Sequence, residues 1–222
     1  MGLLPTGQWW TWAAAYGPSY AGAAAWTLAI AVAASACALA WGAVLFFLRL
    51  AAGRWGERLV GAYVQLFRNT PVLMPIYLIY FGFPLIGLTW PAAVCGGVAL
   101  VLQNGAYVCE IFRGAYKAID RVQHDAVKSI GLPRWTAFRK VTLPQILVHS
   151  IPALGNQAIL LLKDTSLLSA IAVVELTMQA KVLTERTGAA YGPFVVSALF
   201  YLVMVAFGEA LVRAAHKRVR WR

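Results

Sequence analysis

Five long runs of apolar residues, separated by polar or basic segments, dominate the pattern along the chain. The runs cover residues 20–48, 60–83, 90–112, 146–174 and 194–212. Each comes close to or exceeds the roughly 20 residues that an α-helix needs to cross a bilayer. The pattern therefore predicts an all-α, polytopic membrane protein with about five transmembrane helices, formed by a single domain over residues 1–222.

The second run contains a helix breaker. Pro71 lacks a backbone donor and restricts the conformation of Thr70, so we expect the helix to break or kink there. The break would lie near the inner membrane interface, where Arg68 can extend its guanidinium group to water. The simpler alternative is an interfacial break after which the span itself begins near residue 72.

The fourth run is interrupted at Gly155 and Asn156 and again at the polar segment 163–166. This pattern indicates either a broken span or two short helices that meet at the polar segment. Residues 175–186 then form a segment outside the membrane, before the last run.

The third run is polar in its second half, where it carries Gln103, Asn104, Tyr107 and Glu110. Positions 103, 107 and 110 share one face of a helix. A carboxylate such as Glu110 on a membrane helix is costly and therefore suggests a functional site, with substrate contact as one role. The alternative is an ion pair with Arg113, three residues further on. Asn104 is a second candidate for substrate contact.

The formal net charge of +11 is unevenly distributed. Lys and Arg residues cluster at the ends of the apolar runs, mainly within 49–58, 113–140 and 213–222. Positive charge of this kind marks the cytoplasmic side of membrane proteins, so the N-terminus is expected outside and the C-terminus in the cytoplasm. This placement also argues against a nucleic-acid partner.

Metal and catalytic chemistry find little support in the sequence. Cys37, Cys95 and Cys109 all lie in apolar runs, and no spacing typical of metal ligands joins the cysteines or histidines. Ser166 and His149 are the one candidate nucleophile–base pair, but no nucleophile-elbow motif surrounds the serine. We therefore expect neither a metal site nor an enzyme.

The basic segment 113–144, between the third and fourth runs, carries a spaced motif. It reads Asp125-Ala126-Val127, three residues, Gly131, nine residues, then Val141-Thr142-Leu143-Pro144. Gly131 permits a helix-ending turn with φ above zero, and Pro133 suits the first turn of the next helix. Pro144 would mark the start of the following span. A compact helix–turn–helix is the prediction, and a basic helix that meets lipid phosphates is the alternative.

This spacing resembles the cytoplasmic coupling loop of bacterial ATP-binding-cassette importer permeases, whose motif is EAA, three residues, G, nine residues, I-x-L-P. Asp125 stands for Glu, Val127 for the second Ala and Val141 for Ile. Three further stretches resemble the subfamily that handles polar amino acids of the histidine, glutamate, glutamine and arginine type. They are the segment ending RNTP within 63–71, the GAYVCEIFRG run at 105–114 and the LKDTSL run at 162–167.

The resemblance implies a type I importer permease-like fold and a permease subunit in the bacterial cytoplasmic (inner) membrane. Implied partners are an ATP-binding-cassette ATPase subunit, a second copy or similar permease, an external substrate-binding protein, the lipid membrane and the amino acid itself. The sequence has no Walker A motif, so ATP and Mg²⁺ would bind the ATPase, with no cofactor here. Coupling to the ATPase is implied for Asp125, Ala126, Gly131, Leu132, Pro133, Leu143 and Pro144.

Lys163 and Asp164 could present opposite charges to a zwitterionic amino acid, or could pair with neighbouring helices and hold the bundle together. Ser166 is a further candidate, although serines in membrane helices more often bond to backbone carbonyls. A stand-alone secondary carrier or channel for small polar solutes is the alternative function. The absence of an internal repeat argues against common carrier architectures.

Overall fold

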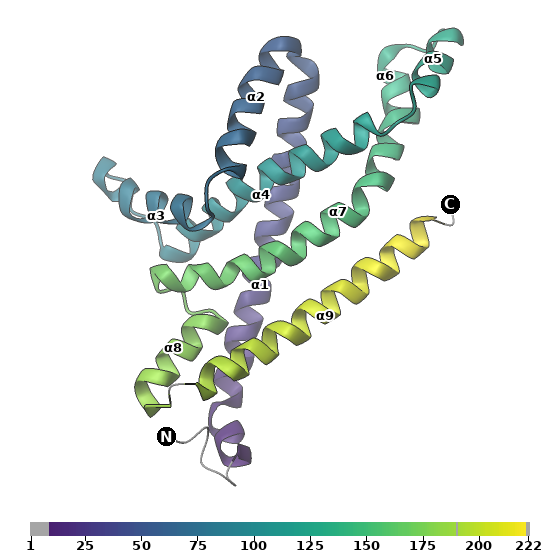
Figure 1. The fold of residues 1–222 in the computed structure, drawn as a ribbon. Helices are drawn as coiled ribbons and strands as arrows, with labels where there is room; N and C mark the ends of the chain where they lie inside the picture. The colour runs from purple at the N-terminus through teal and green to yellow at the C-terminus, as the bar shows by residue number, and fades with distance from the viewer. Residues whose placement is uncertain (1–8, 190, 221–222) are drawn as a thin grey trace.

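The computed structural model describes residues 9–189 and 191–220, and these residues form helices and no strands (Figure 1). The long helices are α1 (Trp9–Ala51), α4 (Ala92–Lys117), α7 (Leu143–Asp164) and α9 (Gly192–Arg220). The shorter elements are α2 (Gly53–Arg68), α3 (Leu73–Gly82), η1 (Phe83–Ile86), α5 (Arg121–Ser129), α6 (Arg134–Ala137), η2 (Phe138–Thr142), η3 (Thr165–Ile171) and α8 (Leu176–Thr187).

Four helical stretches of the described chain are long and apolar enough to cross a membrane. They are Ala15–Ala51, Ala92–Lys117, Arg134–Ile171 and Gly192–Lys217. A fifth span results if α2 and the α3–η1 segment, which are bent by 98° relative to each other, are counted together. The prediction of an all-α membrane protein with about five spans is therefore confirmed.

The expected break at Pro71 is present and separates α2 from α3. Thr70 Oγ1 donates to the Leu66 carbonyl at 2.7 Å, so the last turn of α2 is closed by a side chain. The alternative of a full span beginning near residue 72 is wrong. The 10 residues of α3 and 4 of η1 are too few, because they rise about 20 Å against a hydrocarbon core about 30 Å thick.

The expected interruption at Gly155 and Asn156 is also wrong, because α7 continues through both residues. A Cβ on Gly155 would come within 2.5 Å of Val212 on α9. Gly155 therefore permits a close approach of two helices. The helix changes to 3₁₀ geometry only where α7 meets η3, within the polar segment 163–166.

The segment between α4 and α7 contains the expected helices around a turn, and Gly131 has the predicted positive φ, at +68°. One expectation about prolines needs correction, because Pro133 is the N-cap of α6 and precedes its first turn. Pro144 lies in the first turn of α7, as expected, although the helical backbone is continuous from Arg134 to Ile171 through the π-helical η2. The π turn directly precedes Pro144, which has no N–H to donate to the Lys140 carbonyl.

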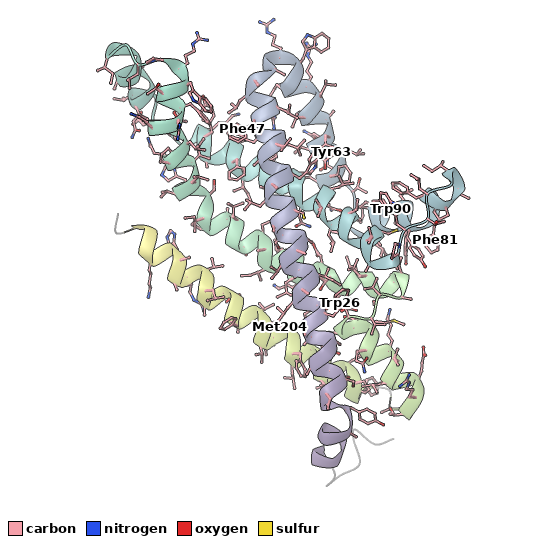
Figure 2. The ribbon with its side chains drawn as sticks, turned by 180° about the vertical axis from the view of Figure 1, so that it is seen from behind. Trp26, Phe47, Tyr63, Phe81, Trp90 and Met204 are labelled. Carbon is pink, nitrogen blue, oxygen red and sulfur yellow. The ribbon has the colours of Figure 1, made fainter. Side chains whose placement is uncertain are left out.

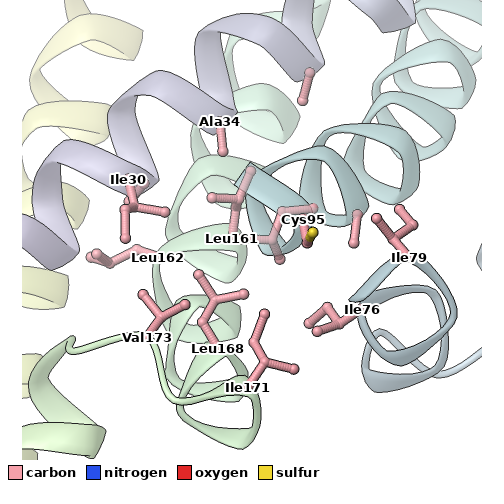
Figure 3. Packing of buried hydrophobic residues seen from close by; sticks show 14 residues of the cluster. Ile30, Ala34, Ile76, Ile79, Cys95, Leu161, Leu162, Leu168, Ile171 and Val173 are labelled. Carbon is pink, nitrogen blue, oxygen red and sulfur yellow. The ribbon is translucent and has the colours of Figure 1, made fainter. Parts of the chain in front are cut away.

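Small residues bring the central helices close together. Ala34 of α1, Leu161 of α7 and Leu168 of η3 belong to one buried cluster (Figure 3). Further along, a Cβ on Gly105 of α4 would lie 2.4 Å from Trp41 of α1, so this crossing requires a glycine. Close packing of this kind supplies the association energy that the hydrophobic effect does not provide between helices in lipid.

Candidate functional site

The polar stripe of α4 faces the end of α2, where the break at Pro71 leaves carbonyls without helical partners. Gln103 Nε2 donates to the Thr70 carbonyl at 3.0 Å, and the Tyr107 hydroxyl donates to the Arg68 carbonyl at 3.4 Å. The Arg68 guanidinium also lies 5.4 Å from the centre of the Tyr107 ring. Two positions of the predicted stripe therefore stabilise the helix break.

Tyr63 of α2 contacts both neighbouring helices (Figure 2). Its hydroxyl accepts a hydrogen bond from Trp41 Nε1 on α1 at 2.8 Å and donates to the Leu102 carbonyl on α4 at 2.7 Å. This side chain therefore ties three helices together beside the break.

Glu110, the third position of the stripe, lies at the centre of an ion-pair network that joins α1, α2 and α4. Its carboxylate accepts from Arg49 Nη1 at 2.6 Å and from Arg113 Nε at 2.9 Å, and Arg68 Nη1 lies 3.7 Å away. Arg49 also donates to both oxygens of Glu57, at 2.5 Å each. Sequence spacing indicated the pair with Arg113, but the pair with Arg49 joins positions 61 residues apart and is visible only in the fold.

Asn104 is buried in the middle of the bundle. Its Nδ2 donates to the Leu100 carbonyl at 2.9 Å, and its Oδ1 accepts from Gln157 Nε2 on α7 at 2.7 Å. The two amides border a cavity of about 180 Å³, between α1, α4 and α7, that Ser35 also lines. Sequence reasoning did not single out Gln157, and its only signal was an amide in an apolar run.

Lys163, Asp164 and Ser166 lie together at the junction of α7 and η3. Lys163 is exposed, whereas Asp164 and Ser166 are half-buried. Neither charged side chain forms an ion pair within the described residues. This pair is therefore available to a ligand or a partner. Gln157, the partner of Asn104, lies about 10 Å before Asp164 along α7. The structure therefore does not bring Asn104 together with Lys163, Asp164 and Ser166.

The five residues predicted to contact substrate thus occupy three places. Glu110 lies near the end of α4 that leads to α5, Asn104 lies in the middle of the bundle, and the group at 163–166 lies at the far end of α7 (Figure 1). They are separated in space because α4 runs towards the α5–α6 segment and α7 runs back from it. Glu110 lies near the end of α4 and Asp164 at the end of α7, so the two lie at opposite ends of this helix pair.

The α5–α6 segment extends from the body of the protein (Figure 1). Asp125 and Ala126 on α5 are exposed, as are Gly131 and Pro133 in the turn, and Leu132 is half-buried. Leu143 and Pro144 lie at the base of the segment, on α7, half-buried and exposed respectively.

Three large apolar side chains of this segment are solvent-exposed, namely Val122 at 71%, Ile130 at 70% and Trp135 at 68%. Exposed apolar groups gathered on a polar segment indicate a protein-binding surface. Sequence reasoning based on the spaced motif missed all three, although their apolar character among charged neighbours was a usable signal.

A buried polar cluster at the other end of the bundle was also missed. Glu175 is fully buried and caps α8, where its carboxylate accepts from the backbone N–H of Thr177 and Met178 at 2.8 Å and from the Tyr201 hydroxyl at 2.7 Å. Burial raises the pKa of the Glu175 carboxyl, and these hydrogen bonds oppose the shift. Glutamate is not among the residues favoured at N-caps, so propensity could not indicate this role.

The neighbouring backbone of Leu176 completes this cluster. Its N–H donates to Thr27 Oγ1 of α1 at 3.1 Å, and its carbonyl accepts from Ser197 Oγ of α9 at 2.7 Å. The start of α8 is therefore held against α1 and α9 by polar contacts from both sides.

No group of three or more His, Cys, Asp or Glu side chains in residues 9–189 and 191–220 could hold a metal ion. The cysteines are free, with Cys95 and Cys109 buried and Cys37 exposed.

Comparison with known proteins extends this picture. Residues 38–221 match the sequence profile described as binding-protein-dependent transport system inner membrane component. A probable amino-acid ABC transporter permease of Sinorhizobium fredii is 34% identical over 178 residues, which are 80% of this chain and 76% of that protein. The glutamine transport system permease of Escherichia coli K12 is 32% identical over 196 residues, 87% of this chain and 90% of that protein.

Solved structures agree with the sequence matches. A chain in the crystal structure of an amino acid ABC transporter with histidines has a TM-score of 0.88 and 29% identity, covering 92% of this chain and 96% of its own. A chain of the methionine ABC transporter in an inward-facing conformation has a TM-score of 0.73 at 18% identity, covering 90% and 95%. The second likeness concerns the fold alone.

Proposed function

This chain belongs to the family of binding-protein-dependent transport system inner membrane components, and from that premise we propose that it carries polar amino acids through a path that includes Lys163 and Asp164. The chain is a membrane permease subunit of an ABC importer, and ATP is hydrolysed on a separate subunit. The expected type I importer permease-like fold is confirmed. Family membership favours this function over a stand-alone carrier or channel.

The observation that carries the substrate proposal is the adjacent pair Lys163 and Asp164, whose charges are not neutralised inside the described chain. A free amino acid carries a carboxylate and an ammonium group, so it offers the complement of both charges. Ionisable groups in membrane-spanning helices usually face the interior of the bundle. The names of the relatives, which are amino-acid and glutamine permeases, support the same class of substrate.

Ser166 is proposed as a neutral hydrogen-bonding group beside this pair. Glu110 could contact substrate only if Arg49 or Arg113 were displaced from its carboxylate. Asn104 could contact substrate through its Oδ1 only if Gln157 were displaced. We therefore propose Lys163, Asp164 and Ser166 as the main substrate contacts and Glu110 and Asn104 as secondary ones.

The α5–α6 segment is the proposed docking element for the ATPase subunit, which would bind ATP and Mg²⁺. The exposed apolar side chains Val122, Ile130 and Trp135 support this role. Further proposed partners are a second permease copy or a similar permease, and an external substrate-binding protein. The proposed location is the bacterial inner membrane with the N-terminus outside and the C-terminus in the cytoplasm, as the basic segments favour.

Transport by the reconstituted complex tests the substrate proposal. Asp164→Asn and Lys163→Gln should each lower amino-acid uptake by about tenfold or more, because each removes one charge-assisted contact. The matched controls are Glu209→Gln and Lys217→Gln, which neutralise exposed residues on α9. The uptake assay uses a panel of radiolabelled amino acids, beside a pull-down that reports assembly. Normal uptake by both variants, or loss of assembly in both, contradicts the proposed path.

A further inference from the structure

A polar pocket of about 470 Å³ lies between α2 and the last turns of α4. Four arginines but only two glutamates line it, so the pocket carries an excess of positive charge. The glutamates are Glu57 and Glu110, and their oxygens already accept hydrogen bonds from Arg49 and Arg113.

The remaining cations of the pocket are Arg58 and Arg68. Arg58 has no carboxylate partner in the described part of the chain, and its guanidinium lies 5.8 Å from the centre of the Trp55 ring. Arg68 reaches Glu110 only at 3.7 Å and is 44% exposed. These two guanidinium groups therefore offer unused donors to an anion in the pocket.

An apolar stripe lies on a neighbouring face of the same helix, roughly a quarter turn from the pocket residue Arg58. Trp55, Leu59 and Leu66 recur at helical spacing on α2 and are 70%, 69% and 63% exposed. Tryptophan is enriched at membrane interfaces, and leucines exposed on a membrane protein contact acyl chains. Arg58 stands beside this stripe, on the side of the helix that faces the pocket.

We propose that the pocket binds the phosphate group of an anionic phospholipid, whose acyl chains lie along Trp55, Leu59 and Leu66. The planar guanidinium fork matches the geometry of phosphate oxygens, and basic pockets between membrane helices take acidic head groups. The combination of free arginines and an adjacent apolar stripe selects a lipid over a soluble anion. This site is independent of the proposed substrate path, which lies at the other end of α7.

Binding to the purified permease–ATPase complex, measured by native mass spectrometry with added dioleoyl phosphatidylglycerol, tests the site. The double variant Arg58→Gln/Arg68→Gln should bind about tenfold more weakly for each arginine removed. Arg54→Gln, which neutralises an exposed arginine outside the pocket, should bind as the unmodified complex does. Phosphatidylcholine, which has the same chains but no net charge, should bind weakly to all three.

A second variant blocks the pocket without removing a charge. A Cβ on Gly61 would meet only Arg49 Nη2, at 3.9 Å, so Gly61→Leu can be accommodated and should place its side chain in the pocket. This variant should also lose phosphatidylglycerol. Unchanged binding in Gly61→Leu and in the double arginine variant overturns the site. Equal binding of phosphatidylcholine, or full displacement of the lipid by inorganic phosphate at equal concentration, overturns the lipid assignment.

Discussion

Glu110 and Asp164 are both carboxylates on membrane-spanning helices, but their surroundings differ. Glu110 is held by Arg49 and Arg113, with 15% of its side chain exposed. Asp164 is half-buried and forms no ion pair with any described residue. Removing a carboxylate that is paired within the bundle leaves its cationic partners without a counter-charge, whereas an unpaired carboxylate requires water, a ligand or a partner.

We expect Glu110→Gln to destabilise the permease by about 3 kcal/mol or less, because it leaves Arg49 and Arg113 partly buried without their shared anion. Thermal denaturation of the purified complex measures this loss. Glu209→Gln, which breaks the exposed pair with Arg213 on α9, is the control and should cost only about 0.5 kcal/mol.

Uptake kinetics, measured beside thermal denaturation, separate a structural role of Glu110 from substrate contact. If Glu110→Gln raises the KM for uptake while thermal stability matches that of the Glu209 variant, then substrate contact is the main role of Glu110. Loss of stability with an unchanged KM supports the ion-pair role.

At the scale of elements, α5 and α6 project from the bundle (Figure 1). Their turn depends on Gly131, whose positive φ disfavours residues with a Cβ. A Cβ at this position would meet no atom within 4 Å. Substitution there thus changes the backbone conformation rather than the packing within the permease.

Gly131→Arg should leave the spans inserted but abolish substrate-stimulated ATP hydrolysis and uptake. The cost of an arginine with positive φ is about 1–2 kcal/mol, and the large cation would enter the proposed interface with the ATPase subunit. The measurement is ATPase activity of the reconstituted complex with and without loaded binding protein, beside a pull-down of the ATPase subunit.

Gly131→Asn is the matched control, because asparagine tolerates the left-handed conformation. It should keep most of the stimulation. Normal stimulation and uptake in Gly131→Arg would contradict the coupling role of the segment.

At the scale of the whole molecule, two of the three basic segments lie at one end of the bundle. The α1–α2 turn and the α5–α6 segment are together at the end opposite the start of α1 (Figure 1). Residues 1–8 and the terminal Arg222 lie outside the described residues. This arrangement is the one expected for the proposed orientation, in which the α5–α6 segment lies in the cytoplasm.

Thiol labelling tests this orientation in a background that lacks the three native cysteines. Thr89→Cys, in the exposed segment between η1 and α4, should react with a membrane-impermeant thiol reagent added outside intact cells. Arg54→Cys, on the exposed first turn of α2, should react only after the membrane is opened. The opposite labelling pattern would reverse the proposed topology.

The sequence by itself determined properties that depend on a few neighbouring positions. The length of the apolar runs predicts the spans, Pro71 predicts the break after α2, and the residue type at Gly131 predicts its positive φ, because each follows from local sterics or local hydrophobicity. The same local reasoning failed at Gly155, where close packing against α9 allows α7 to continue.

Only the tertiary structure decided which side chains have partners. Arg49 meets Glu110 across 61 positions, Asn104 meets Gln157 across 53, and Tyr201 reaches Glu175 across 26. Such contacts depend on how helices cross, which is set by small residues at the crossings and by the requirement that buried polar groups be satisfied. No periodicity within one helix carries that information, so the division of charged residues into paired and available ones emerges only when the helices pack.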